Sequence, residues 1–103
     1  MEFKEGVSLK GLQAPILLAL IEAEKVYKQR MLNMTVTSVS DSEHKNGSLH
    51  YKGLAADLRT KGTGSARSLL GDLKRKLSPL GFDILLEYEG LDNEHIHIEF
   101  DPD

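Results

Sequence analysis

The sequence predicts an α+β domain in which a mostly antiparallel sheet carries helices packed on one face. Three observations lead to this fold class. Apolar residues recur at helical spacing in two segments, they alternate with polar residues in several others, and the two kinds of segment do not follow a regular β-α-β order. The 103 residues suffice for one domain with a modest core, so residues 1–103 are assigned to a single domain.

Two segments are typical of amphipathic helices. Pro15 suits the start of the first, because its missing N–H costs nothing in a first turn. Ser65 suits the N-cap of the second, because its hydroxyl can accept a hydrogen bond from a free backbone N–H. The apolar stripe of the first helix consists of Leu17, Leu20, Ala23, Tyr27 and Met31. That of the second consists of Ala66, Leu69, Leu70, Leu73 and Leu77. We expect both stripes to lie in the core.

Four segments predict strands, at residues 34–39, 54–59, 82–88 and 95–100. Alternation in the second strand places Asp57 and Arg59 on the face opposite its leucines. In the last strand His95, His97 and Glu99 lie opposite the apolar side chains. A histidine and acid face of this kind is expected of a strand that lines a polar site.

Composition excludes several classes of function. The chain has no cysteine, which excludes disulfides, cysteine-ligated zinc and thiol catalysis. A formal charge of −3 argues against nucleic acid as the main partner, and the longest apolar run is too short to span a bilayer. The first residues lack the apolar segment of a secretory signal. We therefore expect a monomer that is cytoplasmic as made, with no membrane partner.

Two stretches combine residues with metal-binding chemistry. The first contains His50 and Asp57, and the second, near the C-terminus, contains His97. Two imidazoles and a carboxylate form a ligand set that zinc accepts in catalytic sites, where the fourth position is left to water. Glu94 stands three residues before His97 and could accept a proton from that water. Taken alone, each of these residues would more often be an ordinary surface or core residue than a metal ligand. The occurrence of the two stretches together favours a zinc site.

Three further residues are candidates for supporting roles. Ser48 and Glu99 could each hold a ligand histidine through a hydrogen bond. Arg59 shares a strand face with Asp57, so it could bind substrate or form a plain ion pair with Asp57 or Glu87.

The two stretches together follow the pattern Ser48-x-His50-x-x-Gly53-x-Ala55-x-Asp57 and then Glu94-His95-x-His97. This pattern resembles the Hedgehog/D-alanyl-D-alanine-peptidase family of zinc enzymes. That family includes D,D-carboxypeptidases, vancomycin-resistance D,D-dipeptidases and phage L-alanyl-D-glutamate endolysins. The order of helices and strands around the two stretches is also similar, so the resemblance covers most of the chain.

The resemblance implies the family's fold and a zinc peptidase that hydrolyses bonds next to D-amino acids in peptidoglycan stem peptides. It implies that His50, Asp57 and His97 hold the zinc and that Glu94 is the catalytic acid and base. His95 would assist by orienting groups or stabilising the transition state. Absence of a signal suits a phage or prophage lysis enzyme that acts on the cell wall after release.

The sequence departs from the family in one respect and leaves other functions open. Many members carry an arginine in the region that matches residues 35–42, and this chain has none there. Arg59 could replace it in binding substrate. An enzyme of the same fold could act on another amide or a dipeptide. A zinc-binding module without catalysis is the alternative of a different class, although the presence of Glu94 argues against it.

Overall fold

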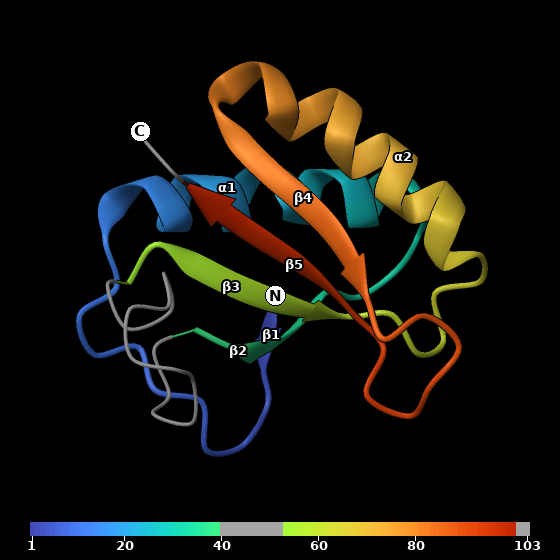
Figure 1. Ribbon diagram of the computed structural model, residues 1–103, viewed down its shortest axis with the longest axis horizontal. Coiled ribbons are helices and arrows are strands. Elements are labelled where there is room, and N and C mark those ends of the chain that lie inside the picture. The colour runs from blue at the N-terminus through green and yellow to red at the C-terminus, as the bar shows by residue number, and fades with distance from the viewer. Residues whose placement is uncertain (40–52, 101–103) are drawn as a thin grey trace.

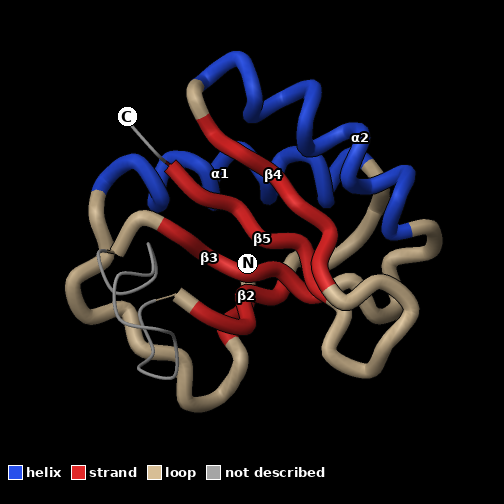
Figure 2. The backbone as a smooth tube through the Cα atoms, in the orientation of Figure 1, coloured by secondary structure: helices blue, strands red, loops and turns tan. Residues whose placement is uncertain are grey.

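The computed structural model describes residues 1–39 and 53–100 of the chain (Figure 1). In chain order the elements are β1 (Glu2–Phe3), α1 (Ala14–Gln29), β2 (Thr35–Ser38), β3 (Ala55–Arg59), α2 (Ala66–Leu77), a 3-10 turn (Ser78–Leu80), β4 (Phe82–Glu87) and β5 (His95–Phe100). Figure 2 shows the strands side by side in one sheet, with the helices forming a second layer. The predicted α+β class is therefore confirmed. None of the described helices has the length and apolar character needed to cross a membrane.

The described strands form one sheet in the order β1-β2-β3-β5-β4. The pairs β2–β3, β3–β5 and β4–β5 are antiparallel, but β1 runs parallel to β2. The sheet is thus mixed, and the expectation of a mostly antiparallel sheet is wrong. The cause lies in the N-terminal residues, whose sequence shows no clear period. The N–H of Glu2 donates to the carbonyl of Met34 and that of Lys4 to Val36, each at 2.8 Å, and α1 provides the crossover that a parallel pair requires.

The core lies between the helices and one face of the sheet. In α2 the predicted stripe is buried from Leu69 to Leu77, and the Ser65 hydroxyl accepts the N–H of Ser68 at 3.1 Å as expected of an N-cap. In α1 the predicted stripe is partly wrong, because Leu17 and Met31 are exposed. The buried residues of α1 are Ile16, Ala19, Leu20, Ala23, Val26 and Tyr27.

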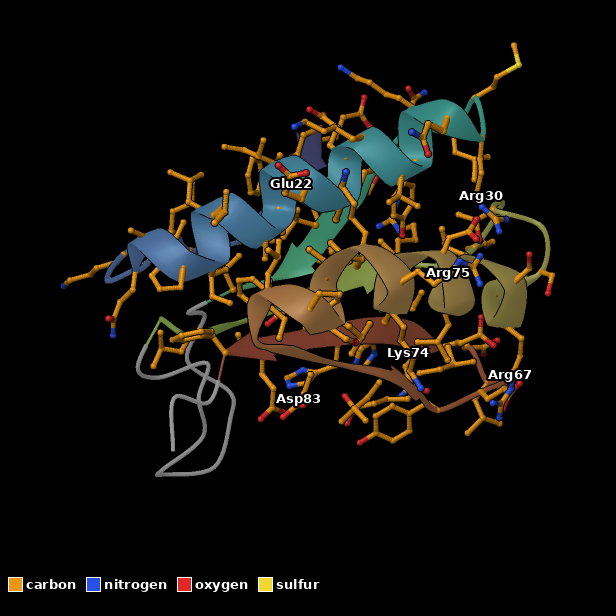
Figure 3. All side chains as sticks on the ribbon, turned by 90° about the horizontal axis from the view of Figure 1, so that it is seen from above. Glu22, Arg30, Arg67, Lys74, Arg75 and Asp83 are labelled. Carbon is orange, nitrogen blue, oxygen red and sulfur yellow. The ribbon has the colours of Figure 1, made fainter. Side chains whose placement is uncertain are left out.

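A polar contact also joins the two helices outside the core. Figure 3 shows α1 and α2 side by side, with Arg30 at the end of α1 beside α2. The Arg30 Nε donates to Asp72 Oδ2 at 2.7 Å, and a second guanidinium nitrogen donates to Ser68 Oγ at 2.7 Å.

Both helices pack against the same face of the sheet. The polar side chains that alternate with the core side chains along each strand therefore lie on the opposite face. We call that face the site face.

Gly53 controls the entry of the chain into β3. It has a φ of +71°, and its carbonyl accepts the N–H of Gln13 at 3.0 Å. A Cβ at this position would overlap the carbonyl of Gly11, whereas a Cβ at Gly62, with a φ of +80°, would meet nothing within 4 Å.

We therefore predict that Gly53→Ala destabilises the protein more than Gly62→Ala. A positive φ alone costs about 1–2 kcal/mol for an L-residue, and the overlap at Gly53 should add roughly 1–3 kcal/mol. Urea unfolding of the two variants and the wild type measures both losses. Equal losses would show that the close approach of Gly53 to Gly11 does not constrain the fold.

Candidate metal centre

The register of three strands brings the candidate residues together on the site face. Asp57 of β3 lies opposite His97 of β5, and Arg59 lies opposite His95. On the other side of β5, Glu87 of β4 lies opposite His95. Residues that face each other across strands have side chains within contact range. β2 carries a bulge opposite Asp57, a feature often found beside functional sites.

His97 is held between two carboxylates. Its Nδ1 lies 2.8 Å from Asp57 Oδ1, and its Nε2 lies 2.8 Å from Glu99 Oε1. Since a carboxylate only accepts, the Nε2–H donates to Glu99. This arrangement directs Nδ1 toward Asp57, as in sites where an outer carboxylate fixes a metal-binding histidine. Asp57 and His97 are therefore joined directly by a hydrogen bond across the β3–β5 pair.

Acidic neighbours control the protonation of the His97 ring. Burial by itself would lower the pKa of the ring. The hydrogen bond and charge of Asp57, with those of Glu87 and Glu99, outweigh burial and raise the pKa of His97. A ring surrounded by acceptors holds a proton strongly, and a divalent ion that binds Nδ1 must displace that proton.

His95 lies beside this pair with its ring fixed at both nitrogens. Its Nδ1–H donates to the carbonyl of Asn93 at 2.8 Å, and its Nε2 lies 2.9 Å from Glu87 Oε1 and 3.6 Å from Asp57 Oδ1. The Tyr88 ring packs at a centroid distance of 5.7 Å. Asp57, Glu87 and His95 each offer a ligand atom, all within 4.8 Å of one another, so this group could hold a metal ion.

The structure gathers Asp57, His95, His97 and Glu99 in one cluster. The other two predicted members, Ser48 and His50, lie outside the described residues. Sequence reasoning treated Glu87 only as a possible partner of Arg59 and missed it as a member of the site. The signal was present, because Glu87 alternates with the apolar residues of its strand and must face the same side as His95.

Glu94 lies in the turn between β4 and β5 and is hydrogen-bonded there. The Thr60 hydroxyl donates to its Oε1, and the N–H of Gly90 donates to its Oε2 at 2.7 Å. These two donors, the Thr60 hydroxyl foremost, lower the pKa of Glu94. Among the described residues no hydrogen bond joins Glu94 to His97.

A cavity of about 530 Å³ opens next to His95. It is lined by Lys4, Thr37, Arg59, Lys61, Asp92, Asn93, Glu94 and His95. Within residues 1–39 and 53–100, its three cationic side chains form no ion pair, so the alternative pairing of Arg59 with Asp57 or Glu87 is absent there. Two carboxylates, Asp92 and Glu94, line the same cavity, so its three cations lie beside these acids as well as beside the acidic cluster.

No protein-family model, curated protein or solved structure matches this chain. The chemistry of the site is therefore argued from its residues. It combines a cluster that could hold a metal ion, a carboxylate with a lowered pKa in an adjoining turn, and a cavity lined by three cations and two carboxylates. That combination suits a ligand with a polar reacting group and an anionic group nearby.

We predict that Thr60→Val raises the pKa of Glu94. The hydroxyl stabilises the charged form of the Glu94 carboxylate by donating to it, so its loss removes that stabilisation, while the Gly90 N–H retains part of the effect. Carbon-detected NMR titration of the glutamate carboxyl groups measures the change. Thr35→Val, on a different strand and outside the cavity, is the control and should leave the value in place. An unchanged Glu94 titration in Thr60→Val would contradict the assignment.

Proposed function

We propose that this protein is a zinc-dependent peptidase that hydrolyses a peptide bond next to a D-amino acid in peptidoglycan stem peptides. The observation that carries the proposal is the arrangement of Asp57, His97 and Glu99, in which the His97 Nδ1 and an Asp57 oxygen lie 2.8 Å apart while Glu99 holds the other ring nitrogen. The choice of peptidoglycan as substrate rests on the sequence pattern shared with the Hedgehog/D-alanyl-D-alanine-peptidase family.

In this proposal His50, Asp57 and His97 hold the zinc ion, and Glu99 fixes the orientation of His97. Zinc bound there would polarise the scissile carbonyl and lower the pKa of a bound water. The chain's own residues supply the remaining functions. Because Asp57 and His97 are largely buried, their geometry is set by the sheet before substrate arrives.

Glu94 is the proposed proton carrier. Its lowered pKa keeps it ionised near neutral pH, so it can accept the proton of an attacking water and pass it to the leaving amine. Its position beside the cavity that also contains His95 supports this role. To reach the water, Glu94 must exchange one of its hydrogen bonds to Thr60 and Gly90, which a turn on the surface can allow. The Nε2–H of His95 donates to Glu87 Oε1 at 2.9 Å, and in this proposal it exchanges that bond for one to the carbonyl oxygen of the substrate.

The cationic cavity is the proposed binding site for a substrate carboxylate. Arg59 lies opposite His95 in the sheet, and Lys4 and Lys61 line the same cavity. Stem peptides carry free carboxylates, and a guanidinium with five donors recognises such a group well. This supports Arg59 as the replacement for the arginine that many family members carry upstream.

One observation favours a second candidate, a zinc-binding module without catalysis. The Glu94 carboxylate is hydrogen-bonded to Thr60 and Gly90. If these bonds persist in the presence of substrate, no base reaches the water. Products released from purified cell wall, identified by mass spectrometry, distinguish the two functions and also reveal whether another amide is the substrate.

We predict that removal of zinc lowers the melting temperature without unfolding the protein. An ion bound only by the folded state stabilises it by mass action, but the core between the helices and the sheet does not depend on the ion. Thermal melting with and without a chelator, followed by zinc re-addition, measures the effect. His50→Ala should lose tight zinc binding; full affinity in that variant would exclude His50 from the site.

We predict that Glu94→Gln keeps tight zinc binding and the native fold. Its turnover should fall on the order of a hundredfold or more, the usual scale for a positioned acid and base. Asp57→Asn and His97→Ala should lose zinc affinity and activity together, because these residues hold the ion. Zinc content and peptide release from cell wall are measured for each. Glu89→Gln, which changes an exposed carboxylate paired with Arg67, is the matched control. Wild-type turnover in Glu94→Gln would overturn the acid and base assignment.

A further inference from the structure

A second set of donor atoms lies directly beside the proposed zinc position. Asp57, Glu87 and His95 come from the three adjacent strands β3, β4 and β5. We infer that they form a second binding position for a divalent cation, which shares Asp57 with the proposed zinc site. The inference rests on the proposed function only in its consequence for catalysis, and the binding itself can be measured without any substrate.

The distances fit coordination of one ion. Donors at about 2.0–2.2 Å from a tetrahedral ion lie roughly 3.3–3.6 Å from each other. His95 Nε2 is 2.9 Å from Glu87 Oε1 and 3.6 Å from Asp57 Oδ1, and one ligand atom from each of the three residues lies within 4.8 Å of the others, so side-chain rearrangement can bring the three donors around one ion. The Nδ1–H of His95 donates to the Asn93 carbonyl. That bond leaves Nε2 as the ligand atom and orients it toward the two carboxylates.

The charge of the cluster supports the binding of a second cation, and the exposure of Glu87 makes this cation the more weakly bound of the two. Asp57, Glu87 and Glu99 place three carboxylates around two imidazoles, and one divalent ion leaves a negative charge among these five side chains. The Asp57 side chain is 9% exposed and that of Glu87 is 40% exposed. The Glu87 position is therefore the outer one, open to exchange with solvent.

Occupation of the outer position has a consequence for the proposed reaction. An ion there takes the Nε2 of His95, the atom proposed to donate to the substrate carbonyl. Excess zinc should therefore inhibit peptide hydrolysis, and Glu87 should determine how sensitive the enzyme is. Zinc bound at the outer position would thus inhibit hydrolysis at the same site.

The test is a zinc titration in competition with a chromophoric chelator, with the bound metal counted by elemental analysis. The wild type should bind two ions, one tight and one at least tenfold weaker. Glu87→Gln should lose the weaker ion and keep the tight one within about threefold, and Glu89→Gln should keep both. One ion in the wild type at saturating zinc, or two in Glu87→Gln, overturns the inference.

Two further measurements separate this inference from the proposed function. In His97→Ala the tight ion should disappear while a weaker, Glu87-dependent ion remains; if removing Glu87 in that variant changes nothing, the outer position is wrong. Peptide release at rising zinc should fall in the wild type and resist inhibition in Glu87→Gln. Equal inhibition of the wild type and Glu87→Gln would reject the proposed inhibition by zinc at the outer position. A wild type that binds two ions yet cleaves no peptide rejects the peptidase and leaves the outer position standing.

Discussion

The contact between Asp57 and His97 is the constraint on which the rest of the site depends. An aspartate that is 6% exposed in the middle of a sheet is costly unless another group compensates its charge. The ring of His97 supplies that compensation directly across the β3–β5 pair, and Glu99 holds the ring from its other side. A one-residue slip in this pairing would turn the histidines into the core, so the register that buries the apolar residues also builds the metal centre.

The site face carries an acidic cluster next to a cavity of mixed charge. The carboxylates of Glu87 and Glu99 lie around the two histidines. The adjoining cavity is lined by the cations Lys4, Arg59 and Lys61 and by the carboxylates of Asp92 and Glu94. His95 stands at the boundary, in contact with Glu87 and on the wall of the cavity. Under the proposed function, a substrate bound across this boundary would present its scissile carbonyl to the zinc ion and a carboxylate to the cations of the cavity.

The turn between β4 and β5 couples the fold to the proposed chemistry. Thr60, just after β3, is linked through its hydroxyl to Glu94, and Gly90 binds the same carboxylate. Tyr88 opens this turn with a φ of +55° and packs against His95. A positive φ in a tyrosine is strained, so the turn is held by its contacts. The same bonds that position Glu94 beside the cavity also set the cost of moving it toward a substrate.

The sequence by itself determined which side each strand residue faces and which chemistry is present. The two-residue period of a strand is local, so alternation alone was enough to place Asp57, His95, His97 and Glu99 together on one face. The buried stripe of α2 was equally predictable, whereas Leu17 and Met31 of the first predicted stripe are exposed, because the rotation of α1 is set by packing against α2 and the sheet. Alternation also placed Glu87 on the polar face of its strand, but only the tertiary structure decided that β4 lies beside β5, that β1 pairs parallel to β2 and that Lys4 reaches the cavity. Those outcomes depend on the pairing of segments far apart in the chain, which no local pattern specifies.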